Sequence, residues 1–439
     1  MIRILDHGSD AGISPAKCKV AQRMKHAKFI FHTGFSLAFC AIIFSSLGCR
    51  RNQNSSEDPA GPHILWSYAP GPDPLSGIAL ASNGTVHFAA TDGIYALSPQ
   101  GKLLWKAPLP SGPVIAAPTL APNGTLYAAS ESGKLFALDS AGNLTWQSLS
   151  TEHKFFTPPA LGAGDELYVA DDYTDLFAFA PSIGPSLIWK QLTYSPAGSR
   201  DDVLLGNNTS AYGSEAGAWR SSPVIGADDM IYLAHQQWLY RLNLHGDVLW
   251  FIQLPVGHLG FPAIGGDGAV YIEGHNPNWL FAIGHDGKQR WIMRLSNPLR
   301  GSPVVDSAGV IYLCDSDFVK AVSPEGQSKW YLQADCNSGP ALAADGTLYL
   351  GMTARELRQN GPRHSFLGAF TAEGHLKWKI EIHGAVRGAP AIAPSGTIFF
   401  TTDQGYAYAV SDAGSPPMDS PWPRFQHDAQ NSGRASFYR

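Results

Sequence analysis

The sequence predicts an all-β protein, an eight-bladed β-propeller whose blades are four-stranded antiparallel sheets. Tryptophan ends an apolar segment eight times, and six of the seven intervals between these tryptophans span 39 to 48 residues. A repeat of about forty residues indicates a stack of similar supersecondary units. Glycine turns separate the short apolar segments, and one segment near the N-terminus has no repeat of its own. The repeated tryptophans are Trp66, Trp105, Trp146, Trp189, Trp250, Trp291, Trp330 and Trp378.

The repeat at residues 117–146 shows the plan of one blade. Its first two apolar segments flank Asn123-Gly124, and its last two flank Ala141-Gly142. Such turns between apolar runs are strong hairpin signals, and we expect type I′ turns, in which both central residues have positive φ. Counting first strands gives eight, which start near Ile78, Pro118, Pro159, Pro223, Pro262, Pro303, Pro340 and Pro390.

The two ends of the repeat region complement each other. The eighth repeat, at residues 397–410, lacks a fourth strand with a tryptophan, whereas residues 63–66 form such a strand without a repeat. We expect the N-terminal strand to complete the last blade, because a closed ring leaves no open sheet edge. The indoles then cover the joints between neighbouring blades. A sandwich array or an open solenoid uses similar strands but does not explain this match.

Composition and charge restrict the function. The chain has 439 residues, of which 44% are hydrophobic and 15% charged, with a formal net charge of −5. Few charges and many turn-forming residues suit short strands in one monomeric propeller. A protein that binds nucleic acid usually has a basic face, so no nucleic-acid partner is expected.

The N-terminal region has the order of an export signal. Basic residues after Met24 precede a mostly apolar run at residues 29–47, which Gly48 and Cys49 follow. We therefore interpret residues 1–48 as a signal segment that starts at Met24, and Cys49 as a lipid-modified residue. An uncleaved membrane anchor is the alternative, since about 20 apolar residues span a bilayer. Residues 49–62 are then a polar tether, residues 63–414 the propeller, and residues 415–439 a C-terminal extension expected to pack on it.

Two cysteines remain after Cys49. Cys314 ends the second strand of blade six, and Cys336 follows the fourth strand of that blade. Both strand ends belong to the same face of a propeller, and an oxidising compartment favours paired thiols. We expect a disulfide between Cys314 and Cys336.

The same face carries the candidate binding residues. An arginine stands three residues before the first-strand proline in blades four, six and eight, as Arg220, Arg300 and Arg387. Asn337 takes this position in blade seven, and His258 lies one step earlier in blade five. Equivalent positions of a radial repeat face one axis, so these side chains predict a rim that binds an anionic ligand. The alternative is that each arginine bonds loop carbonyls within the fold.

Two long segments, residues 193–219 and 353–365, are also expected on this face. Long loops on a rigid scaffold often carry binding or catalytic residues, and the alternative is that these two only cap the central funnel. The sequence indicates no catalytic residue and no metal site. The histidines are dispersed, whereas zinc ligands usually have short, fixed spacings. No G-x-S-x-G sequence supports nucleophilic catalysis.

The repeat units resemble a known family. Residues 96–105, 137–146 and 321–330 resemble the tryptophan-docking repeats of the PQQ-like, or quinoprotein-dehydrogenase-like, β-propellers, and residues 421–434 resemble a segment that accompanies such repeats. The resemblance implies the fold and leaves open several activities. Redox-active members have adjacent cysteines and a calcium site of carboxylate and amide oxygens, and this sequence has neither pattern. No cofactor is expected.

These observations predict a non-enzymatic exported lipoprotein that binds a protein or polymer partner at the bacterial cell envelope. In plan it is similar to the propeller lipoprotein of the outer-membrane barrel-assembly machine, and Arg50 after the cysteine favours the outer membrane. The alternatives are a quinoprotein-like dehydrogenase and a binder of an anionic small ligand or glycan at the funnel mouth. The sequence leaves open the partner and the side of the membrane.

Overall fold

The structure is a computed structural model that describes residues 61–71, 76–110, 112–151, 153–172, 175–181, 186–192, 221–355, 363–412 and 414–435. These residues form eight antiparallel sheets around a central axis and contain no helix. Consequently, no helix in the described part of the chain is long and apolar enough to cross a membrane. The predicted signal segment, Cys49 and the tether lie outside the described residues.

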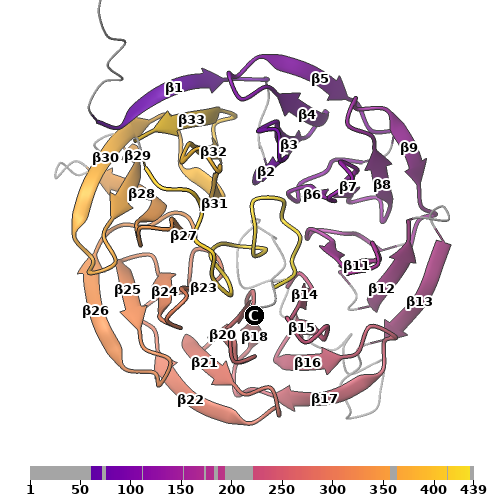
Figure 1. The fold of residues 1–439 in the computed structure, drawn as a ribbon. Helices are drawn as coiled ribbons and strands as arrows, with labels where there is room; N and C mark the ends of the chain where they lie inside the picture. Colours follow the sequence, from indigo (N-terminus) through magenta and orange to yellow (C-terminus); the bar gives the residue numbers. More distant parts are fainter. Residues whose placement is uncertain are drawn as a thin grey trace, which may run out of the picture. The chain divides into compact units, whose positions relative to one another are not determined.

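Figure 1 shows the eight sheets as the blades of a ring, each with its strands ordered outward from the axis. The sequence prediction of an eight-bladed all-β propeller is confirmed. The strands of the first four blades are β2 (Ala79–Leu80), β3 (Val86–Ala90), β4 (Gly93–Leu97) and β5 (Leu103–Ala107); β6 (Thr119–Leu120), β7 (Leu126–Ala129), β8 (Leu135–Leu138) and β9 (Leu144–Gln147); β10 (Ala160–Leu161), β11 (Leu167–Ala170), β12 (Asp175–Ala180) and β13 (Ser186–Leu192); and β14 (Val224–Ile225), β15 (Ile231–His235), β16 (Trp238–Leu242) and β17 (Val248–Gln253).

The remaining four blades follow the same plan, with one additional short strand in blade five. Their strands are β18 (His258–Leu259), β19 (Ala263–Ile264), β20 (Val270–His275), β21 (Trp279–Ile283) and β22 (Gln289–Arg294); β23 (Val304–Val305), β24 (Ile311–Cys314), β25 (Phe318–Val322) and β26 (Ser328–Gln333); β27 (Ala341–Leu342), β28 (Leu348–Arg355), β29 (Arg363–Phe370) and β30 (Leu376–Ile382); and β31 (Val386–Ile392), β32 (Ile398–Thr402), β33 (Ala407–Ser411) and β1 (His63–Tyr68).

The N-terminal strand closes the ring. Strand β1 pairs antiparallel with β33, and the order of the last sheet is β1-β33-β32-β31. Its register shifts between Ile64 and Trp66, as the register of the fourth strand of blade one shifts between Leu103 and Trp105. The shared bulge places Trp66 opposite Ala409 as Trp105 lies opposite Ala96. Strand β1 therefore serves as the fourth strand of blade eight, with the same pairing, bulge and tryptophan position as the fourth strand of blade one.

The repeated tryptophans join each blade to the next. The Trp66 indole N–H donates to the carbonyl of Pro99 over 2.8 Å, across the joint between blades eight and one. A Cβ atom on Gly101, whose φ is +80°, would lie 2.6 Å from the Trp66 ring. Only glycine leaves room for the ring at this point. The same donation to a turn carbonyl recurs for Trp105, Trp189, Trp250, Trp291 and Trp330, whereas Trp378 donates to the Asp412 carboxylate.

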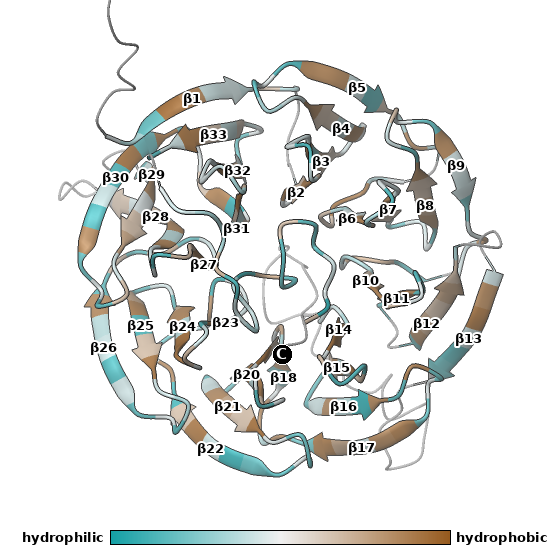
Figure 2. Ribbon diagram, viewed as in Figure 1, coloured by the Kyte–Doolittle hydropathy of each residue, from teal (hydrophilic) through white to brown (hydrophobic). Residues whose placement is uncertain are grey.

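The hydrophobic core is divided among the joints. Each buried cluster combines side chains from the facing surfaces of adjacent blades, and together the clusters cover all eight joints. The cluster between blades eight and one contains Phe88 and Phe399, with Trp66 packed against it. The outer strands are half exposed, and hydrophilic residues are frequent on β22, β26 and β30 (Figure 2).

The hairpin turns differ from the type I′ turns expected from the sequence. At the first hairpin the Gly84 N–H donates to Ala81 O, and the Ala81 N–H donates to Thr85 O. Gly84 has a φ of +80°, whereas Asn83 has no positive φ. These bonds describe a type I turn followed by a left-handed glycine, a loop one residue longer than expected. Asn83 instead uses its side-chain oxygen to accept the Thr85 N–H over 3.0 Å.

The C-terminal segment, residues 414–435, crosses the centre of the ring (Figure 1). Its backbone carbonyls accept hydrogen bonds from the first strands of blades one, two, three, four, six and seven. Asn431 is fully buried, and its amide donates to the carbonyls of Ile78 and Pro118 at 3.0 and 2.9 Å. The segment thus ties together first strands that are far apart in the sequence.

Candidate functional site

A central cavity of about 610 Å³ lies among the loops that precede the first strands. Its lining comes from blades one, two, three, five, six, seven and eight and from the C-terminal segment. The loops of blades two, three, six, seven and eight place the same repeat position at the cavity wall, because the blades are related by rotation about the axis. The lining includes Ile115, Phe156, Phe261, Arg300, Asn337, Arg387 and Arg424.

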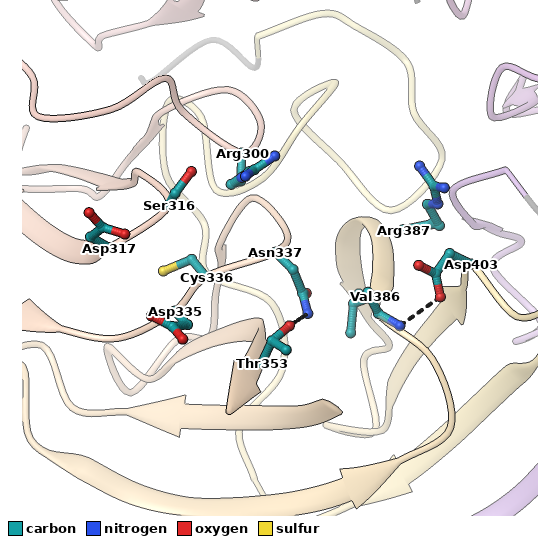
Figure 3. Close-up of a pocket in the computed structure, with 11 residues that line it drawn as sticks. Arg300, Ser316, Asp317, Asp335, Cys336, Asn337, Thr353, Val386, Arg387 and Asp403 are labelled. Carbon is teal, nitrogen blue, oxygen red and sulfur yellow. Dashed lines mark hydrogen bonds between the residues drawn. The ribbon is translucent and has the colours of Figure 1, made fainter. Parts of the chain in front are cut away.

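The structure brings three of the sequence-predicted binding residues together. Arg300, Asn337 and Arg387 line the central cavity from blades six, seven and eight. They also line an adjoining side cavity of about 560 Å³, which Figure 3 shows. Arg220 lies outside the described residues, as do residues 193–219 and the middle of the 353–365 segment.

The two arginines are exposed and make no side-chain hydrogen bond or ion pair with any other described residue. The alternative in which each arginine bonds loop carbonyls of the fold therefore does not describe Arg300 and Arg387 within this part of the chain. Asn337 is held more firmly, because its amide donates to the Thr353 hydroxyl over 2.8 Å. Its side-chain oxygen is buried and has no hydrogen-bond partner there.

His258 lies elsewhere. It begins β18, pairs with His275 of β20, and stacks on the His275 ring with the ring centres 4.5 Å apart. Burial, aided by the neighbouring His275, lowers the pKa of His258 to about 4. His258 does not line the central cavity, because β18 pairs with β20 and turns the His258 ring toward His275.

The side cavity is of mixed charge. It contains Asp317, Asp335 and Asp403 in addition to the arginines. Asp403 accepts the Ala385 N–H over 2.8 Å, and Asp317 accepts the Asn297 amide over 2.7 Å. These carboxylates are therefore partly used in holding loops. No group of three or more histidine, cysteine, aspartate or glutamate side chains in the described ranges is arranged to hold a metal ion.

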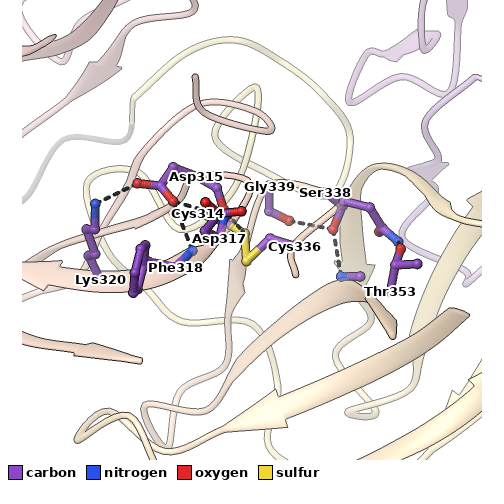
Figure 4. The surroundings of a disulfide bond; sticks show 11 residues. Cys314, Asp315, Asp317, Phe318, Lys320, Cys336, Ser338, Gly339 and Thr353 are labelled. Carbon is purple, nitrogen blue, oxygen red and sulfur yellow. Dashed lines mark hydrogen bonds and ion pairs between the residues drawn. A yellow bond between two sulfur atoms is a disulfide. The ribbon is translucent and has the colours of Figure 1, made fainter. Parts of the chain in front are cut away.

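Cys314 and Cys336 form a disulfide beside the side cavity, with their Cα atoms 6.1 Å apart (Figure 4). Cys336 lines the cavity, and both cysteines are buried. Next to Cys314, the fully buried Asp315 carboxylate binds the Lys320 ammonium over 2.6 Å and accepts the Phe318 N–H. The disulfide and the Asp315–Lys320 ion pair together hold the loops that lie next to Arg300 and Asn337.

Sequence reasoning missed the floor of the central cavity, which Arg424 and Phe425 of the C-terminal segment form. Arg424 is 5% exposed, and burial lowers its pKa to about 10. Its guanidinium donates to the carbonyls of Asp428 and Ala389 and to the side-chain oxygen of Asn431. No repeat signal marks this segment. Sequence reasoning also missed two apolar residues of the cavity wall, Ile115 and Phe156. They occupy the arginine position in blades two and three, so alignment of the repeats could have identified them.

The described lining of the central cavity carries hydrogen-bond donors and apolar side chains. No aspartate, glutamate, histidine or cysteine is among the described residues of the central cavity. A hard cation needs carboxylate and amide oxygens, and a general base needs a titratable acceptor. The described lining of the central cavity therefore offers no carboxylate to hold a calcium ion beside a quinone. It offers cationic hydrogen-bond donors and an apolar wall.

Comparison with known proteins agrees with this architecture. A family model described as outer membrane protein assembly factor BamB matches residues 56–237 and 235–424. BamB from Moraxella catarrhalis is a similar solved structure, with a TM-score of 0.62 and 13% identity, covering 80% of this chain and 99% of that one. A europium-containing methanol dehydrogenase has a TM-score of 0.59 and 11% identity, covering 82% and 95%. No curated protein matches the sequence.

Proposed function

The chain belongs to the PQQ-like β-propeller family of the outer membrane protein assembly factor BamB, and from this premise we propose that it is a non-enzymatic scaffold of the bacterial cell envelope. It binds another protein or a polymer through the face that carries the central cavity. The match of the family across residues 56–424 supports this proposal most strongly. The cavity adds a second reason, because its described lining offers binding groups and no acid–base pair.

The finer parts of the proposal concern export. Lipid modification of Cys49 anchors the propeller, and Arg50 directs it to the outer membrane. Metabolic labelling with an alkyne-bearing palmitate analogue tests the anchor, since the wild-type protein incorporates label and Cys49→Ser does not. Equal labelling of the two forms, or a mature protein that retains residues 24–48, contradicts the lipid anchor and favours the uncleaved membrane segment.

A site-specific crosslink tests the scaffold. Ile115 is 38% exposed at the cavity, and Leu104 is 51% exposed on the outer strand β5. A photoreactive phenylalanine analogue at Ile115 should give a discrete adduct in intact cells, whereas the same analogue at Leu104 should not. The two positions are matched as exposed apolar residues. Absence of any adduct at Ile115, or the same adducts at both positions, argues against a partner at this face.

The dehydrogenase alternative has a direct test. The purified protein is mixed with pyrroloquinoline quinone and calcium, and quinone absorbance and dye-linked alcohol oxidation are recorded. We expect neither stoichiometric uptake nor oxidation, because the central cavity supplies no described carboxylate for the cation. Tight uptake with turnover replaces the scaffold proposal with an enzymatic one.

A further inference from the structure

We propose that the central cavity binds a protruding segment of the partner protein in which a carboxylate side chain stands next to apolar ones. This inference rests on the proposed scaffold function and names the chemistry of its partner. Its basis is a set of arginines and an apolar wall that line the same cavity.

The charge comes from three arginines. Arg300, Arg387 and Arg424 line the central cavity, and its described lining contains no carboxylate. Arg300 and Arg387 have no side-chain hydrogen bond or ion pair within the described ranges, and Arg424 is buried with an Nε atom that has no hydrogen-bond partner there. The groups that accept from Arg424 are two carbonyls and an amide oxygen, all uncharged. The nearest described carboxylates are Asp428, whose charge acts on Arg424, and the aspartates of the adjoining side cavity, which Arg300 and Arg387 also line. The central cavity itself holds only the cations, so an anion that enters it gains Coulomb energy from Arg300 and Arg387.

The shape of these donors favours a carboxylate. Guanidinium groups bind planar oxyanions through paired hydrogen bonds, and carboxylates match this geometry. Arg300 and Arg387 come from blades six and eight and flank Asn337 of blade seven (Figure 3), so an acidic side chain entering the funnel meets guanidinium donors from blades six and eight. An uncharged ligand can accept hydrogen bonds from these guanidinium groups but gains no charge–charge attraction from them.

Blades two, three and five give the cavity an apolar wall. Ile115 and Phe156 take the arginine position in blades two and three, and Phe261 of blade five packs edge-on against Phe425 with ring centres 5.0 Å apart. Ile115 remains 38% exposed. Covering such a wall with an apolar side chain removes apolar surface from water, which favours binding. A free inorganic anion or a polar glycan would leave this apolar wall exposed to water and would therefore lack this contribution to binding.

Together these features describe an amphipathic socket. A volume of about 610 Å³ lies within the range of pockets that enclose ligands of a few side chains. A loop or terminus of a folded protein can present an acidic residue and its aromatic or aliphatic neighbours together, with little loss of entropy when the presenting loop is rigid.

A displayed library of random heptapeptides, selected on the immobilised full-length protein, tests the inference. We expect enrichment of sequences with aspartate or glutamate beside phenylalanine, tryptophan or leucine. The most enriched peptide, synthesised with a fluorophore, should lose at least tenfold in affinity when its acidic residue is replaced by the amide. No enrichment, or enrichment without acidic residues, overturns the inference. Inorganic phosphate that binds as tightly as the peptide also overturns it.

Protein variants complete the test. R300E/R387E should weaken the peptide at least tenfold and R300Q/R387Q less, whereas R294E on the outer strand β22 should bind as the wild type does. Circular dichroism checks the fold of each variant. Unchanged affinity in R300E/R387E overturns the inference. The two proposals fail in different ways. If the protein with wild-type arginines gives no crosslink from Ile115, the scaffold proposal is wrong. If the Ile115 crosslink forms equally well in R300E/R387E, the scaffold proposal stands and only the binding of a carboxylate by these arginines is wrong.

Discussion

The second strand of every blade places an aromatic ring against the repeated tryptophan, and blade one uses histidine for this purpose. The His87 ring lies 5.6 Å from the Trp105 ring, whereas blade eight places Phe399 5.9 Å from Trp66. The other blades have tyrosine at this position, namely Tyr127, Tyr168, Tyr232, Tyr271, Tyr312 and Tyr349. The perturbation His87→Phe therefore replaces the exceptional ring with one that the fold already accepts.

The magnitude follows from burial. His87 is 4% exposed, and burial lowers its pKa from 6.5 to about 4, opposed in part by a hydrogen bond with the backbone of Ala79. The unfolded chain takes up a proton below pH 6.5 and the folded chain does not, so stability is fully present above pH 6.5 and falls as the pH drops toward 4. Between pH 7.5 and pH 5 the lost free energy of unfolding from this one ring is about 2 kcal/mol.

Urea unfolding at the two pH values, followed by tryptophan fluorescence, measures the effect. We expect wild-type stability to fall between pH 7.5 and pH 5 by about 2 kcal/mol more than that of His87→Phe. Any constant packing cost of the larger ring cancels in this difference. His245→Phe is the control, because His245 is exposed in a turn and its substitution should leave the wild-type pH dependence unchanged. Equal pH dependence of wild type and His87→Phe refutes the reasoning.

Three further predictions concern the joints, the disulfide and the central segment. Trp66→Ala removes the ring that packs on Gly101 and should lower the free energy of unfolding by about 4 kcal/mol in urea titrations; a loss below about 1 kcal/mol contradicts ring closure by β1. Replacing both Cys314 and Cys336 by serine should cost about 3 kcal/mol and should make the protein insensitive to reductant, whereas a variant as stable as the wild type shows that the bond carries no stability. Asn431→Ala leaves two buried carbonyls without their donor and should cost about 3 kcal/mol, measured by the same titration; a cost typical of a surface residue argues against the central segment as a tie between blades.

Local signals predicted the strands well. The start of each first strand, the glycine turns and the tryptophan positions follow from patterns within a single repeat, and the structure shows eight blades where eight repeats were counted. The turn type was wrong because φ at Asn83 depends on one additional residue in the loop. A short sequence pattern such as Asn-Gly is compatible with both loop lengths, and the pairing of the flanking strands selects between them.

The candidate site was predicted only in part. Repeat register identified Arg300, Asn337 and Arg387, which line one cavity. It also selected His258, whose strand β18 turns the ring toward His275 instead. Arg424 belongs to no repeat, so register gave no reason to choose it.

The sequence by itself determined the repeat, the blade count and the closing strand, because each depends on spacing along the chain and on the need to bury a strand's apolar face. Tertiary structure alone decided which side chains share the cavity and what forms its floor. Asn431 bonds Ile78 across 353 residues of sequence. Such contacts depend on how the completed ring places its centre, and no local pattern encodes that position.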